Sequence, residues 1–116
     1  MTETATATPV SFTVVRDPKR LNMVQLQLSF TVPLLSTGSK PCCLRSLDEA
    51  FAKESSLTPF MARLAFDLFR YHSTDILDLG VRMNIFTLRH NGNLSVEIIK
   101  RYVKNTALQI GSVYQD

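Results

Sequence analysis

The residues best suited to bind a ligand form a basic cluster near the end of the chain. Lys100, Arg101 and Lys104 surround the aromatic residue Tyr102 within one five-residue segment. Phosphate groups bind to positive charge, and a tyrosine ring can stack on a base or lie at a lipid headgroup. The segment therefore predicts a site for nucleic acid or for another anionic surface. The alternative interpretation is that these residues are only the solvated end of a strand and bind no ligand.

Other basic residues lie outside this cluster and extend the predicted site. Arg82 and Arg89 precede it, and an earlier turn contains Arg16, Lys19 and Arg20. The predicted nucleic-acid-binding residues are therefore Arg16, Lys19, Arg20, Arg82, Arg89, Lys100, Arg101, Tyr102 and Lys104. Whether these segments form one surface depends on how the chain folds or assembles.

The distribution of charge supports this prediction better than its total does. Thirteen Lys and Arg against ten Asp and Glu give a formal net charge of +3 over 116 residues. The net charge is +2 over residues 1–40, −2 over residues 41–81 and +3 over residues 82–116. Such a basic–acidic–basic pattern is evidence about binding partners, not about fold.

The residues around His72 could suggest a hydrolytic site. Ser73, Asp75 and Asp78 follow His72 closely in the sequence. A Ser-His-Asp triad is defined by its arrangement in space, so closeness along the chain is weak evidence for one. A simpler interpretation is that Ser73 or Thr74 caps a turn and that both aspartates are solvated. We therefore expect the protein not to be an enzyme.

The sequence predicts neither a metal site nor a cofactor. Cys42 and Cys43 are adjacent, and with the distant His72 and His90 they lack the paired ligand spacing of a zinc site. Neighbouring Cα atoms lie about 3.8 Å apart, closer than the roughly 4.4–6.8 Å usual in disulfides, so we expect reduced thiols. The glycines are scattered and form no phosphate-binding loop.

The composition is typical of one globular domain. Hydrophobic residues make up 45% and charged residues 20% of the chain, close to the averages for folded proteins. No apolar run approaches the roughly 20 residues of a membrane-spanning helix, and no signal-peptide pattern opens the chain. We expect a flexible tail over residues 1–9, with a Thr-rich strand as the alternative, and a single domain over residues 10–116.

The first third of the chain predicts a β-hairpin. Apolar residues alternate over residues 10–15 and, more completely, over residues 24–32. This period of two is typical of antiparallel strands that bury one face. The following segment, residues 34–43, contains Gly38 and Pro41 and predicts a loop.

The middle of the chain predicts two helices. Ser46 and Glu49 have the spacing of a capping box, which indicates a short helix. Thr58 and Pro59 indicate the start of a second helix that continues to about His72. Its predicted buried stripe consists of Phe60, Met61, Leu64, Ala65, Leu68 and Phe69.

The last third predicts a second hairpin. Residues 81–89 have the composition of a strand, and Asn91 and Gly92 are typical of a tight hairpin turn. Residues 94–103 are rich in β-branched side chains and predict the returning strand. A helix that begins at Ser95 is the alternative, because its apolar residues also have helical spacing.

Four smaller expectations concern this second hairpin and the residues around it. Residues 73–79 could form a helical turn, and residues 106–114 a last short strand. His90 should be exposed in the turn. A two-residue loop would place Arg82 opposite Arg101, and this pairing would need an anion or an acidic partner between the two charges.

These patterns together predict an α+β fold. A small antiparallel sheet, built from an N-terminal and a C-terminal hairpin, should pack against two central helices. We expect a non-enzymatic, homo-oligomeric protein that binds nucleic acid, RNA in particular, through the basic C-terminal hairpin. The alternatives are a protein-interaction or assembly module and a peripheral membrane matrix-like protein, such as those of viruses. The expected location is intracellular, in the cytoplasm or the nucleus, with no integral membrane segment.

Overall fold

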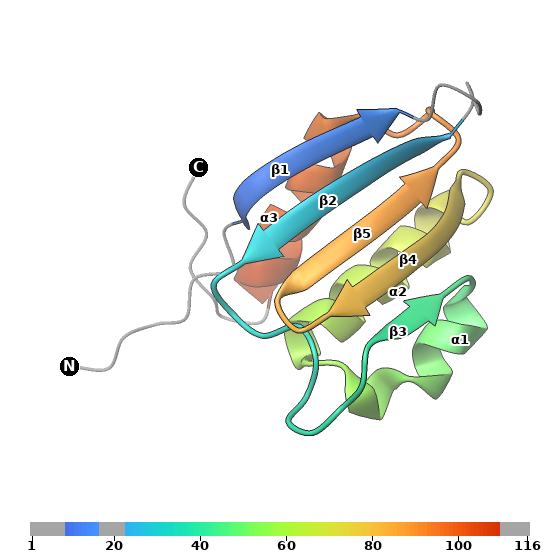
Figure 1. The fold of residues 1–116 in the computed structure, drawn as a ribbon. Coiled ribbons are helices and arrows are strands. Elements are labelled where there is room, and N and C mark those ends of the chain that lie inside the picture. Colours follow the sequence, from blue (N-terminus) through green and yellow to red (C-terminus); the bar gives the residue numbers. More distant parts are fainter. Residues whose placement is uncertain (1–8, 17–22, 110–116) are drawn as a thin grey trace.

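An antiparallel sheet with helices packed on one of its faces forms the framework of the protein. The computed structural model describes residues 9–16 and 23–109. The strands are β1 (Pro9–Arg16), β2 (Val24–Phe30), β3 (Cys42–Leu44), β4 (Ile76–Arg82) and β5 (Ile85–His90). The helices are α1 (Leu47–Ala52), α2 (Pro59–His72) and α3 (Val96–Gln109), with a short 3-10 helix, η1, at Glu54–Ser56. The strand order is β1-β2-β5-β4-β3 (Figure 1), which confirms the predicted α+β class.

The predicted N-terminal hairpin is confirmed. In β2, Val24, Leu26, Leu28 and Phe30 are buried, whereas the residues between them are partly exposed. β1 pairs with β2 so that Val14 lies opposite Leu26. The alternation arises because helices cover one face of the sheet and no described helix covers the other (Figure 1).

Two predicted segments lie mainly outside the described residues. Of the tail expected over residues 1–9, only Pro9 is described, and it begins β1. Of the basic turn that follows this strand, only the backbone of Arg16 is described, at the end of β1.

Both central helices are confirmed, with one change in how each begins. The Ser46 hydroxyl accepts a hydrogen bond from the Glu49 N–H at 3.2 Å, as a capping box requires. The Glu49 carboxylate reaches back to the N–H of Arg45, at 2.7 Å, instead of that of Ser46. The Thr58 hydroxyl donates to the Pro33 carbonyl at 3.1 Å and so ties the start of α2 to the end of the first hairpin.

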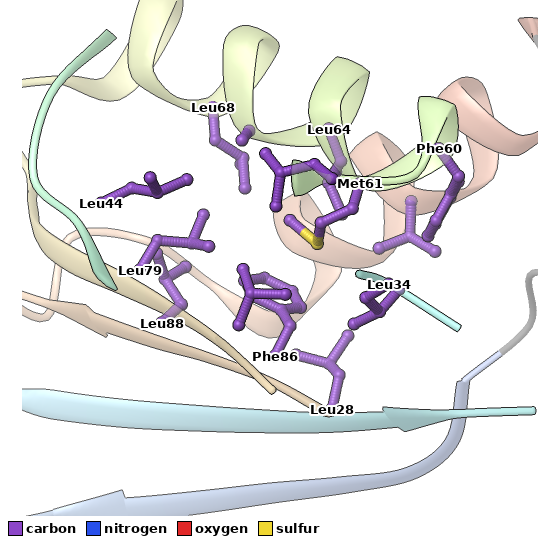
Figure 2. Packing of buried hydrophobic residues seen from close by; sticks show 14 of the residues in the cluster. Leu28, Leu34, Leu44, Phe60, Met61, Leu64, Leu68, Leu79, Phe86 and Leu88 are labelled. Carbon is purple, nitrogen blue, oxygen red and sulfur yellow. The ribbon is translucent and has the colours of Figure 1, made fainter. Parts of the chain in front are cut away.

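The hydrophobic core lies between α2, α3 and the covered face of the sheet. All six residues of the predicted α2 stripe are buried. Figure 2 shows Met61, Leu64 and Leu68 of α2 pointing toward Leu28 and Phe86 of the sheet. This packing fixes α2 under the central strands and leaves its opposite side exposed.

The C-terminal hairpin exists, but its turn lies earlier than predicted. β4 and β5 are joined at Met83 and Asn84, and Met83 has a φ of 39°. The Asn84 side chain donates to the carbonyl of Phe30 at 2.7 Å, and the Leu34 N–H donates to the carbonyl of Met83 at 2.7 Å. These contacts with the end of β2 stabilise a turn that the sequence pattern did not indicate.

The strand predicted over residues 94–103 is wrong, and the helical alternative is correct. The Ser95 hydroxyl accepts from the N–H of Ile98 at 3.2 Å and so caps the start of α3. Ile99, Val103 and Ala107, four residues apart, are fully buried. Burial of this helical face outweighs the strand preference of the β-branched residues. The pairing of Arg82 with Arg101 is therefore wrong as well.

Three smaller predictions also need correction. The helical turn over residues 73–79 is wrong, because β4 begins at Ile76. Residues 106–109 belong to α3 instead of a last strand, and the remainder of that prediction lies outside the described residues. The loop over residues 34–43 contains the start of β3, which pairs with the edge of β4.

Candidate nucleic-acid interface

The basic cluster lies on the outer side of α3, not on a hairpin. Arg101 and Lys104 are exposed and Lys100 is half-buried. All three side chains leave the helix on the sides that the buried residues Ile99 and Val103 do not occupy. The cations therefore follow one helix over little more than one turn. The exposed Glu97 lies one turn earlier on the same side, next to Lys100 and Arg101.

Tyr102 contacts α2 instead of projecting into solvent. Its hydroxyl lies 2.9 Å from Nε2 of His72, and the two rings meet edge to face with centroids 5.3 Å apart. Burial, with smaller effects of Asp67 and Tyr71, raises the pKa of Tyr102. The ring thus joins the two helices, and we do not include base stacking by Tyr102 in the site.

A hollow beside this contact gives the cluster a concave part. His72, Ile98, Arg101, Tyr102 and Asn105 line it, and its volume is about 350 Å³. The Arg101 guanidinium and the Asn105 amide can both donate hydrogen bonds there. The hollow is therefore a place where an anionic group could contact Arg101 without displacing the core.

Arg82 and Arg89 lie in the other layer of the molecule. Both belong to the β4–β5 hairpin, whereas α3 packs beneath β1 and β2 (Figure 1). Arg89 donates through Nε to Asp78 at 2.8 Å and forms a second contact with the same carboxylate. This hydrogen bonding raises the pKa of Arg89 and balances its charge. Only Arg82 adds an exposed cation here, and it does not extend the α3 cluster.

The third group of predicted residues is described only in part. The backbone of Arg16 pairs with Val24 at the end of β1. Lys19 and Arg20 lie outside the described residues. The structure therefore brings together Lys100, Arg101 and Lys104, and it separates them from Arg82 and Arg89.

Sequence reasoning missed a polar cluster where β5 joins α3. The Asp75 carboxylate accepts from the side-chain amides of Asn91 at 3.1 Å and Asn93 at 3.2 Å. His90 is only 3% exposed, which corrects its predicted exposure, and its Nδ1 accepts from the Gly92 N–H at 3.0 Å. The Asn-Gly pair does mark a reversal of the chain, but it leads into a helix.

We expect Asp75 to make the stability of the fold depend on pH in the acid range. The two amide hydrogen bonds lower the pKa of Asp75 in the folded protein. Its contribution is therefore complete above the unfolded value of about 3.9 and is lost as pH falls through the lower folded value. Urea unfolding at about pH 5 and about pH 3 should show a smaller loss for Asp75→Asn than for the wild type. Equal losses would contradict this role.

The cysteines and the other metal-binding side chains form no evident centre in the described part of the chain. Cys42 and Cys43 are free thiols on the edge strand β3, and burial raises the pKa of Cys42. Within residues 9–16 and 23–109, no three His, Cys, Asp or Glu side chains gather as metal ligands would.

Comparisons with known proteins do not extend these observations. The chain matches no known family model, no curated protein and no solved structure. Among the described helices, none combines the length and the apolar character needed to cross a bilayer.

Proposed function

We propose that this protein binds RNA, without catalysis, through phosphate contacts on the outer side of α3. The observation that carries the proposal is the group of three cations, Lys100, Arg101 and Lys104, on the outer side of one helix, where they outnumber the one carboxylate of α3, Glu97. Positive charge arranged in this way attracts a polyanion whatever its base sequence. The binding should accordingly be sensitive to salt and tolerant of sequence.

The burial of α3 favours a polyanion over a membrane as the partner. A helix that lies in a bilayer surface inserts its apolar face among the lipids. In α3 that face is already in the core, because Ile99, Val103 and Ala107 have no exposed surface. A flexible single strand can follow one short convex helix more closely than a straight duplex can. Single-stranded RNA is therefore the ligand that we propose.

The test compares two arginines that lie in different layers of the fold. Binding of a labelled single-stranded RNA is measured by fluorescence anisotropy at several salt concentrations. Three phosphate contacts predict a contribution of about −2 from each copy of the chain to the slope of log affinity against log salt. Arg101→Glu should weaken binding at least about tenfold and make this slope shallower by about 0.7 or more.

Arg82→Glu is the matched control, because it changes the net charge equally at an exposed arginine of the sheet. It should leave RNA affinity nearly unchanged. Equal losses in the two variants would show that only total charge matters and would contradict the α3 site. Binding to anionic vesicles but not to RNA would replace the proposal with a membrane-surface function.

A further inference from the structure

The outer edge of β1 lacks the features that prevent pairing over residues 11–15, because its register shift lies before them, between Pro9 and Ser11. β1 is eight residues long, and no described strand pairs with its outer side. From Val10 to Val15 it contains neither a charge nor a proline. Natural sheets usually protect an edge with a charge, a proline, a bulge or a short strand. A long uncharged edge of this kind is suited to pairing with another strand.

The opposite edge of the same sheet shows the usual protection. β3 has only three residues. Lys40 and Pro41 precede it and Arg45 follows it. β1, in contrast, has its proline and its charge only at its two ends, Pro9 and Arg16, with five uncharged residues in regular pairing between them.

The side chains near the end of β1 also lack cover on both faces of the sheet. Val14, opposite the buried Leu26, faces the helical layer but is 45% exposed. Val15, on the uncovered face, is 48% exposed. Beside Val14, a hollow of about 290 Å³ reaches His90 and the start of α3. An additional strand beside β1 would cover both valines.

We propose that the outer edge of β1 pairs with β1 of a second copy of the chain, antiparallel, with Thr13 opposite Thr13. The twofold axis of such a pair is perpendicular to the sheet, so the helices of both copies lie on the same face. Residues directly opposite each other must then lie on the same face of the sheet. This condition allows Thr13 to pair with Thr13 and Val14 to pair with Phe12. The pairing spans the regular residues 11–15 and forms a continuous ten-stranded sheet from the five strands of each copy.

A second copy fits this edge better than an arbitrary strand because the pairing is self-complementary. Opposed threonines are a favourable cross-strand pair. The only charged residue of β1, Arg16, lies at the end of the strand, beyond the five paired residues. The two copies of Arg16 are then about 20 Å apart at about 3.4 Å per residue, so no like charges face each other.

Substitutions at Thr13 test this arrangement without touching the α3 cations. Light scattering on the full chain, without RNA, should show a dimer for the wild type. Thr13→Lys and Thr13→Glu should each give monomers, because each places like charges directly opposite. Mixing the two variants should restore a dimer. Thr87 lies on the same face of the sheet, because Gln27 of β2 is opposite both Thr13 and Thr87. Thr87→Lys adds the same charge on β5 and should leave the dimer intact.

Two results would overturn the proposal: a wild type that stays monomeric over a wide concentration range, or a Thr13→Lys variant that still dimerises. Circular dichroism establishes that each variant is folded. The proposal does not depend on RNA binding, so the failure of either leaves the other intact.

Crosslinking supplies a second measurement that also tests the register. In a background with Cys42→Ser and Cys43→Ser, Thr13→Cys should form a covalent dimer on oxidation. Opposite Cα atoms in an antiparallel pair are about 4.5–5.5 Å apart, within the disulfide range. Val15→Cys should not crosslink, because the two copies of residue 15 would be about 13 Å apart. Crosslinking at residue 15 but not at residue 13 would contradict the Thr13 register.

Discussion

Truncation of Phe86 to alanine is expected to lower the free energy of unfolding by about 3–5 kcal/mol. Phe86 lies on the central strand β5, between Leu28 of β2 and Val81 of β4, and has no exposed surface. Met61 of α2 lies close to it in the core (Figure 2). Because neighbours surround the ring on several sides, they cannot all close the cavity that alanine would leave.

The measurement is urea unfolding, with the midpoint compared at an unchanged slope. A domain of this size has a total stability of about 5–15 kcal/mol, so the substitution removes a large part of it. Tyr71→Ala is the control, because this aromatic residue of α2 is 65% exposed. The control should lose less than about 1 kcal/mol. Similar losses in both variants would contradict the packing of α2 on β5.

The elements that the sequence predicts well are those with one unambiguous periodicity. β2 alternates over its whole length, because one face meets the core and the other does not. α2 has an apolar stripe and a proline at its start, so its face and its beginning are both defined. In these segments local pattern and tertiary burial favour the same structure, and the prediction succeeds.

The prediction fails where local signals compete or are short. Residues 94–103 fit a strand by composition and a helix by spacing, and packing of Ile99 and Val103 decides the outcome. In β4 a register shift between Ile76 and Asp78 interrupts the alternation that would identify a strand. β3 has only three residues and draws its stability from pairing with β4, which no local pattern encodes.

In the candidate site, the sequence predicts which basic residues form a group but not where that group lies in the fold. The basic residues Lys100, Arg101 and Lys104 could be identified as a group from the sequence, because their closeness does not depend on the fold. Their separation from Arg89 could not be predicted, since it follows from α3 being a helix in the other layer. The ion pair of Arg89 with Asp78 could not be predicted either, because it joins two strands whose register the sequence does not define.

Loss of the β1 pairing is expected to reduce RNA affinity although Thr13 lies outside the α3 cluster. α3 packs beneath β1 and β2 (Figure 1), so a twofold axis at the β1 edge places the two α3 helices near each other on one face. Two copies of the cluster then present six cations in place of three. The expected slope of log affinity against log salt changes from about −2 for a monomer to about −4 for a dimer.

The comparison of wild type with Thr13→Lys at matched salt concentrations tests this expectation. Thr13→Lys adds a positive charge, so total charge alone would predict tighter binding by the variant. Weaker binding with a slope about half as steep requires that assembly doubles the contact surface. By linkage, RNA that bridges both α3 helices should also strengthen the wild-type dimer by the same factor. Tighter binding by Thr13→Lys, with an unchanged slope, would show that each copy binds RNA independently.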